Sequence, residues 1–125
     1  PFPAQVGWHP WFADGDRPPT LVFTAPTMYE RDADYIASGR LVEPSSHPWD
    51  DCFVGVSAPP RVRYQDGVEL ELTSDCDHWV VYEPAHALCV EPQSGPPDAF
   101  TLAPVIVRPD RPLERRFTIR SLSHT

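Results

Sequence analysis

The chain of 125 residues is 41% hydrophobic and 22% charged, a composition that allows a folded core and excludes an intrinsically disordered chain. Its 18 acidic residues outweigh 10 basic ones, all of them Arg, and a net charge of −8 without a basic stripe excludes a nucleic-acid-binding protein. A membrane-spanning helix is excluded too, because no apolar run approaches the roughly 20 residues that cross a bilayer.

Short β-strands are expected along the first third of the chain, separated by turn-forming residues. Ala4 to Phe12 and Thr20 to Ala25 are typical of strands, and residues 13–19 between them are rich in Asp, Gly and Pro. Residues 28–35 fit either a strand or one helical turn. Ser38 to Arg40 should break that element.

The clearest local signal is a β-hairpin in the middle of the chain. Its strands, Arg61 to Gln65 and Val68 to Thr73, flank Asp66-Gly67, a dipeptide typical of two-residue turns. Alternation sends the leucines of the second strand to the core and Glu69 and Glu71 to the other side. We expect that side to be a solvated face.

Further strands are expected at Asp50 to Val56, His78 to Glu83, Ala87 to Glu91, Thr101 to Arg108 and Arg116 to Leu122. The His78 strand is continuously apolar and should be central in its sheet. About eight short strands, with turns at intervals of about ten residues, predict an all-β fold, either an antiparallel sandwich or a barrel.

Three cysteines, Cys52, Cys76 and Cys89, are odd in number and contain no closely spaced metal-binding pair. Reduced thiols in a cytoplasmic protein explain them most simply. The run Cys76-Asp77-His78 is too short a signal to predict a zinc site, so we expect no metal.

Glu91 is the strongest candidate for a functional residue. Alternation places it on the same strand face as Ala87 and Cys89, so small neighbours leave room for a ligand. Pro92 should end the pairing of this strand, and Gly95 to Asp98 should form a rigid loop after it. The pattern alone favours a strand-end carboxylate that accepts hydrogen bonds from backbone N–H groups of the loop.

Three segments resemble one known family. GWHPWF (Gly7 to Phe12), WDDCF (Trp49 to Phe53) and EPQSGPPDAF (Glu91 to Phe100) are similar to signatures of the aldose 1-epimerases, or galactose mutarotases, and follow one another in the family's order. The resemblance implies an antiparallel β-sandwich of the galactose mutarotase-like (supersandwich) type. It also implies that residues 1–125 are the C-terminal portion of one such domain, whose N-terminal half is absent here and is either missing or a separate chain.

The resemblance further implies an isomerase that interconverts the α and β anomers of a free hexose, glucose or galactose, without a cofactor or metal. In the family pattern Glu91 is the catalytic base, His9 the acid and Asp50 a sugar-binding residue. Gln93 would share the strand face of Glu91 and bind a sugar hydroxyl, and Trp11 or Trp49 would stack on a face of the sugar. Apart from the sugar and the N-terminal half, no partner, nucleic acid or membrane is implied.

Other interpretations of these residues stay open at this stage. His9 fits an aromatic cluster, Asp50 a loop cap, Gln93 a surface amide and Trp11 the core. A hexose-6-phosphate 1-epimerase is an alternative function that would need several Arg side chains at the pocket rim. The candidates for such a rim, by their location in loops, are Arg17, Arg31 and Arg40. A non-catalytic carbohydrate-binding sandwich is a further alternative function.

Overall fold

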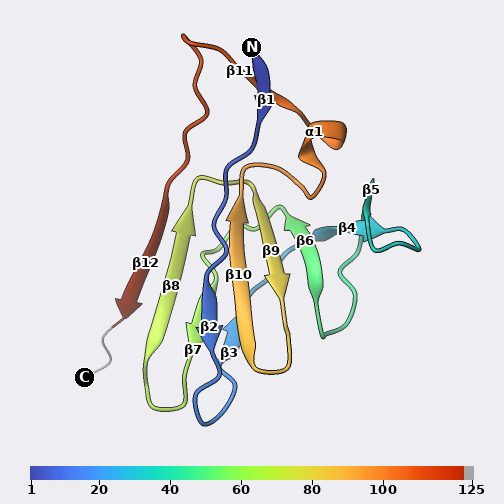
Figure 1. Cartoon of the computed structure of the whole chain (residues 1–125). Helices are drawn as coiled ribbons and strands as arrows, with labels where there is room; N and C mark the ends of the chain where they lie inside the picture. Colours follow the sequence, from blue (N-terminus) through green and yellow to red (C-terminus); the bar gives the residue numbers. More distant parts are fainter. Residues whose placement is uncertain (123–125) are drawn as a thin grey trace.

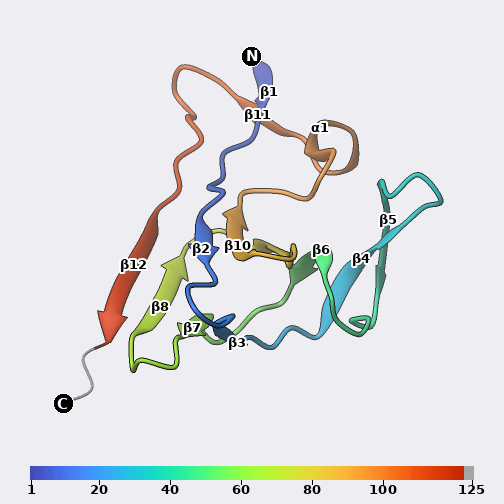
Figure 2. The ribbon, with the colours of Figure 1, turned by 60° about the horizontal axis from the view of Figure 1, so that its bottom comes forward.

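Two antiparallel sheets pack face to face in the computed structural model, which describes residues 1–122 (Figures 1 and 2). The larger sheet has six strands in the order β2, β10, β9, β6, β4 and β5. Their bounds are β2 (Trp11–Ala13), β10 (Ala87–Gln93), β9 (His78–Tyr82), β6 (Asp50–Val54), β4 (Thr27–Arg31) and β5 (Ala37–Val42).

The smaller sheet has four strands in the order β12, β8, β7 and β3. Their bounds are β12 (Phe117–Leu122), β8 (Glu69–Ser74), β7 (Arg61–Arg63) and β3 (Thr20–Val22). A separate two-stranded ribbon joins β1 (Phe2–Ala4) to β11 (Val105–Val107), next to the short helix α1 (Ala99–Leu102). The only helix among residues 1–122 thus has four residues, and no helix there is long and apolar enough to cross a membrane.

The core lies between the two sheets because each sheet turns one apolar face inward. From the six-stranded sheet, Phe53, Val81 and Val90 are fully buried, and from the four-stranded sheet Val62 and Leu72 meet them. Leu88 and Val90 point into this core, as the alternation in β10 predicted. Residues Ala87, Cys89 and Glu91 therefore lie on the opposite, outer face of the six-stranded sheet.

The predicted all-β class, the hairpin and the central position of the His78 strand are confirmed. Twelve strands form instead of about eight, since β5 forms where a break was predicted and the predicted strand from Ala4 to Phe12 gives way to β1 and β2. The prediction that Ser38 to Arg40 breaks a strand is wrong, because Gly39 lies inside β5 with φ of 89°. The strand predicted at Thr101 to Arg108 is also wrong in its first half, where α1 forms.

Glu69 and Glu71 are buried, which contradicts the predicted solvated face. In the register of β7 with β8, Arg61 stands opposite Glu71 and Arg63 opposite Glu69, and Arg120 of β12 also contacts Glu71. The N···O distances of these ion pairs are 2.7–3.3 Å. Arginine side chains cover the acids because the long guanidinium groups of both neighbouring strands reach over them.

Candidate active site

The site depends on the pairing of the N-terminal segment with β10. Ala13, Phe12 and Trp11 pair with Ala87, Leu88 and Cys89, and farther along an isolated bridge joins Gly7 to Gln93. The same register holds on both sides of the gap at residues 8–10. It therefore sets His9 directly across from Glu91, on the same face of the sheet, as cross-strand neighbours.

Two prolines interrupt the hydrogen bonds of this pairing without changing its register. Pro10 divides the predicted strand from Ala4 to Phe12, because it has no N–H to donate. The prediction that Pro92 ends the pairing of β10 is wrong: Pro92 pairs with Trp79 of β9, and β10 continues to Gln93. Its carbonyl accepts from the Trp8 N–H at 3.1 Å. The N–H and C=O groups of one residue point to the same side of a strand. Because the Pro92 carbonyl faces the N-terminal segment, its missing N–H would face that segment too, and the hydrogen bonds between β10 and β9 are unaffected.

His9 and Glu91 meet across this register. The distance from His9 Nε2 to Glu91 Oε2 is 3.5 Å; the Glu91 side chain is 7% exposed and that of His9 52%. Burial raises the pKa of the Glu91 carboxyl above its usual value, and the nearby Asp50 carboxylate adds to the rise, whereas His9 and a Gln93 hydrogen bond oppose it. A carboxylate poised in this way beside a solvent-accessible imidazole can exchange protons with a ligand.

Gln93 joins β10 to the segment that carries His9. Its Nε2 donates to the Trp8 carbonyl at 3.2 Å, and its amide also hydrogen-bonds Glu91. Gly7 makes this arrangement possible, because a Cβ on residue 7 would overlap Gln93 Oε1. The amide is therefore engaged by the protein, and its expected role as a direct sugar contact stays a prediction.

Trp11 extends the site along the outer face. It is 55% exposed, so the alternative of a core residue is ruled out. Its ring stacks on His9 with centroids 5.2 Å apart and an interplanar angle of 15°, and on His86 with centroids 6.5 Å apart and an interplanar angle of 18°. Tyr82 meets Trp11 edge-on. An exposed aromatic platform thus lies next to the His9–Glu91 pair, suitable for the C–H face of a sugar.

Asp50 lies two strands away from β10, in the same cross-sheet row as Cys89 and Tyr82. Arg31 contacts Asp50 through Nη2 and Asp51 through Nε, each at 3.3 Å. Sequence reasoning expected the two neighbouring acids to point opposite ways, yet Arg31 gathers both. The Asp50 side chain remains exposed, and its assignment as a sugar contact stays a prediction.

A pocket of about 470 Å³ opens beside these residues, between the β4–β5 hairpin and the loop after β10. Arg31 and Cys52 form part of its lining, and Cys52 lies in one cross-sheet row with Glu91, about 10 Å away over two strand spacings. Its whole lining is Tyr29, Arg31, Tyr35, Ile36, Ala37, Cys52, Pro97 and Asp98. The loop predicted to be rigid after Glu91 therefore forms one wall.

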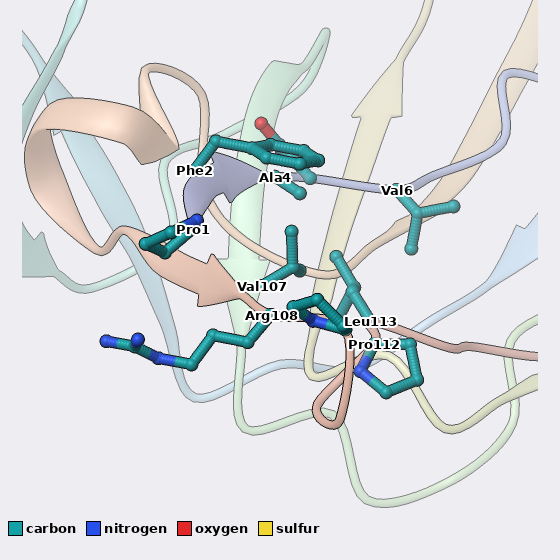
Figure 3. A pocket seen from close by; sticks show the side chains of 10 residues that line it. Pro1, Phe2, Ala4, Val6, Val107, Arg108, Pro112 and Leu113 are labelled. Carbon is teal, nitrogen blue, oxygen red and sulfur yellow. The ribbon is translucent and has the colours of Figure 1, made fainter.

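A second hollow, of about 580 Å³, lies between the β1–β11 ribbon and the turn that follows it. Figure 3 shows that its labelled walls are mostly apolar, with Phe2 and Ala4 from one segment and Val107 and Leu113 from another. Its lining contains neither a carboxylate nor a histidine. It lacks the groups needed for acid–base chemistry, so the His9–Glu91 face is the candidate active site.

His47 and His78, which belong to none of the three motifs, have structural partners. His47 Nδ1 contacts Glu83 at 2.9 Å and stacks on Trp49, whose ring packs against the core. His78 Nδ1 contacts Asp77 at 2.7 Å. Sequence reasoning missed the position of Arg31 between the two acids, because no local pattern reports a contact that spans β4 and β6.

Comparison with solved structures identifies the fold. The crystal structure of a "putative aldose 1-epimerase" from Escherichia coli K12 matches this chain with a TM-score of 0.66 and 17% sequence identity. The match covers 96% of this chain and 50% of that protein's chain. A galactose mutarotase-like protein from Clostridium acetobutylicum matches over 98% of this chain and 48% of its own, with a TM-score of 0.67 and 14% identity. No protein-family model and no curated protein sequence matches the chain.

The fold is therefore a galactose mutarotase-like antiparallel β-sandwich, as the resemblance of the three motifs implied. The chain spans about half the length of both solved structures. At such low identity the likeness concerns the fold, and the chemistry has to be argued from the residues themselves.

We expect Gly7→Ala to lower the free energy of unfolding by about 1 kcal/mol, because the new Cβ displaces the Gln93 amide from its hydrogen bonds. Urea denaturation of a double-mutant cycle with Gln93→Ala measures this effect. In the Gln93→Ala background, Gly7→Ala should cost much less. Equal costs in both backgrounds would contradict the proposed contact.

Glu91→Gln is expected to stabilise the fold at pH 7, because burial makes the ionised carboxylate unfavourable in the folded state. A raised folded pKa means that stability falls as pH rises through the ordinary value near 4.5, so the gain should appear above that pH and vanish well below it. Denaturation curves of the wild type and the variant, measured at pH 7 and at a pH well below the ordinary carboxyl value, test this prediction. Glu43→Gln, at an exposed position, should have no effect.

Proposed function

We propose that this chain carries the acid–base pair of an aldose 1-epimerase-type isomerase, which interconverts the α and β anomers of a free hexose. The observation that carries the proposal is the cross-strand pair of a half-exposed His9 and a buried Glu91, 3.5 Å apart on the outer face of the sheet. The order of the three motifs and the similarity in fold support the same family.

Glu91 would act as the base on the anomeric hydroxyl. Ionised Glu91 takes the proton from O1 while protonated His9 gives a proton to the ring oxygen O5, and the C1–O5 bond breaks to leave an open-chain aldehyde. Rotation about C1–C2 presents the other face of the aldehyde. On reclosure the two residues exchange roles, so both protons return and the pair is regenerated.

The short distance between the two residues suits this chemistry. O1 and O5 are bonded to the same carbon, so the groups that exchange protons with them must also lie close together. Glu91 is buried on β10 and accepts a hydrogen bond from Gln93, whereas His9 is half-exposed and lies just before β2, outside a regular strand. A fixed base and an accessible acid are consistent with a ligand that arrives from solvent.

The sugar would lie over the pair, between the Trp11 ring and the pocket beside β4. Trp11 would stack on a C–H face of the pyranose, and Asp50 would accept hydrogen bonds from its hydroxyls. Gln93 would serve mainly through Glu91. Further contacts would come from an N-terminal half, in the same polypeptide or a separate one, since the chain spans about half of each matched structure.

The charge at the site favours an uncharged hexose over a hexose phosphate. Arg31 is the sole Arg in the lining of the pocket and already contacts Asp50 and Asp51. Arg40 contacts Glu30, and Arg17 donates to Gln65 in a different hollow. The carboxylates of Glu91, Asp50 and Asp98 would repel a phosphate, so none of the three candidate arginines supports the phosphate alternative.

Saturation-transfer NMR of equilibrated glucose or galactose tests the activity. Glu91→Gln and His9→Ala should each slow anomer exchange in the assembled protein by about 10²–10⁴-fold, since each removes one proton-transfer group. Glu43→Gln is the control and should exchange sugar at the wild-type rate. Exchange at the wild-type rate in both site variants would refute the assignment, and sugar binding by the wild type without exchange would favour a binding module.

Glucose 6-phosphate should compete poorly for the site. At equal concentrations it should leave the exchange rate of glucose nearly unchanged, whereas galactose should slow it, because only the phosphate meets the carboxylates. Stronger inhibition by the phosphate than by galactose would support the hexose-6-phosphate epimerase instead.

A further inference from the structure

Three different metal-ligating side chains converge at the site, and sequence reasoning did not connect them because they come from two distant segments. The ligand atoms of His9, Cys89 and Glu91 all lie within 4.8 Å of one another. Cys89 precedes Glu91 by two residues on β10, so both side chains leave the same face, and His9 reaches them from across the pair.

The geometry fits a tetrahedral ion. With ligand bonds of 2.0–2.3 Å, the edges of a tetrahedral zinc site measure about 3.3–3.8 Å. The His9 Nε2 to Glu91 Oε2 distance of 3.5 Å already has this length. The distances from the Cys89 sulfur to the other two ligand atoms must shorten by no more than about 1.5 Å to reach the length of a tetrahedral edge. His9 can supply that adjustment because it is half-exposed and outside the regular strand.

Of the three free, buried cysteines in the chain, Cys89 is the one whose sulfur lies beside His9 and Glu91. It is fully buried, its sulfur is unbridged, and among residues 1–122 it has no hydrogen-bond partner. It points into the same space as a buried carboxylate and an imidazole. Soft sulfur together with imidazole nitrogen selects Zn²⁺ or Cd²⁺ rather than Mg²⁺ or Ca²⁺, which prefer oxygen.

We propose that His9, Cys89 and Glu91 form a binding site for a thiophilic divalent cation of the Zn²⁺ and Cd²⁺ class. The cation takes one nitrogen, one sulfur and one oxygen from the protein, and water from the exposed side completes the tetrahedron. Asp50, two strands away, adds negative charge, and Arg31 is held by that acid and Asp51. On binding, the thiol loses its proton to solvent as the metal–thiolate bond forms, so affinity rises with pH.

The site requires only the three side chains, so it stands whether or not the chain is an epimerase. If it is one, the ion occupies the same lone pairs that the acid–base reaction uses, and Zn²⁺ would be an inhibitor and not a cofactor.

The ultraviolet charge-transfer band of a cadmium thiolate tests the proposal. Cys52→Ala and Cys76→Ala leave Cys89 as the sole cysteine in the chain, so any such band must come from it. We expect one equivalent of Cd²⁺ to saturate the band. Cys89→Ala should abolish it, and His9→Ala should weaken Cd²⁺ binding at least about tenfold.

His47→Ala, which changes a histidine bound to Glu83, is the matched control and should leave the titration unchanged. Circular dichroism verifies that each variant is folded; His9→Ala is the safer of the two site variants because His9 is half-exposed. Absence of the band in the protein with Cys89 alone, or equal Cd²⁺ affinity with and without His9, would overturn the proposal.

Discussion

The antiparallel register between the N-terminal segment and β10 is the constraint on which the site depends. A single register carries the chain from Ala13 opposite Ala87 to Gly7 opposite Gln93, although two prolines remove ladder bonds between these points. A slip of one residue would turn His9 to the other face of the sheet, away from Glu91. Gly7 and Gln93 fix the register where the ladder is weakest, because the amide of Gln93 fits only against a residue without a Cβ.

Burial of Glu91 carries a cost in stability that the surroundings offset in part. The opposite face of β10 supplies core contacts through Val90. On the Glu91 face, Cys89 lies beside the carboxylate, the Gln93 amide hydrogen-bonds it and the His9 imidazole approaches it. These contacts oppose the desolvation of the carboxylate without cancelling it, since its pKa remains raised. Glu69 and Glu71 in the other sheet show the contrasting solution, in which several Arg groups surround buried acids. The sparse pairing at Glu91 is what a proton-transfer group requires.

Local patterns predicted the local structure well. The turn chemistry of Asp66-Gly67 and the alternation in β8 and β10 are effects between near neighbours, so the hairpin and the inward leucines were predictable. Features that depend on pairing between distant strands were not. Arg61 and Arg120 cover Glu71 from two other strands, and α1 forms where alternation predicted a strand. The His9–Glu91 contact was reached through motif resemblance, because nothing in the spacing of two residues 82 positions apart reports their register.

The outer face of the six-stranded sheet combines properties that rarely serve a purely structural surface. Trp11 is exposed, Glu91 is buried without a guanidinium partner among the described residues, and Cys89 is a buried thiol between them. On a face that merely awaited cover by other strands, an apolar residue in place of Glu91 would be more stable. Here polar and aromatic groups instead converge on one point from two segments. Proton transfer and cation binding draw on the same lone pairs there, so the convergence accounts for both proposals without a second site.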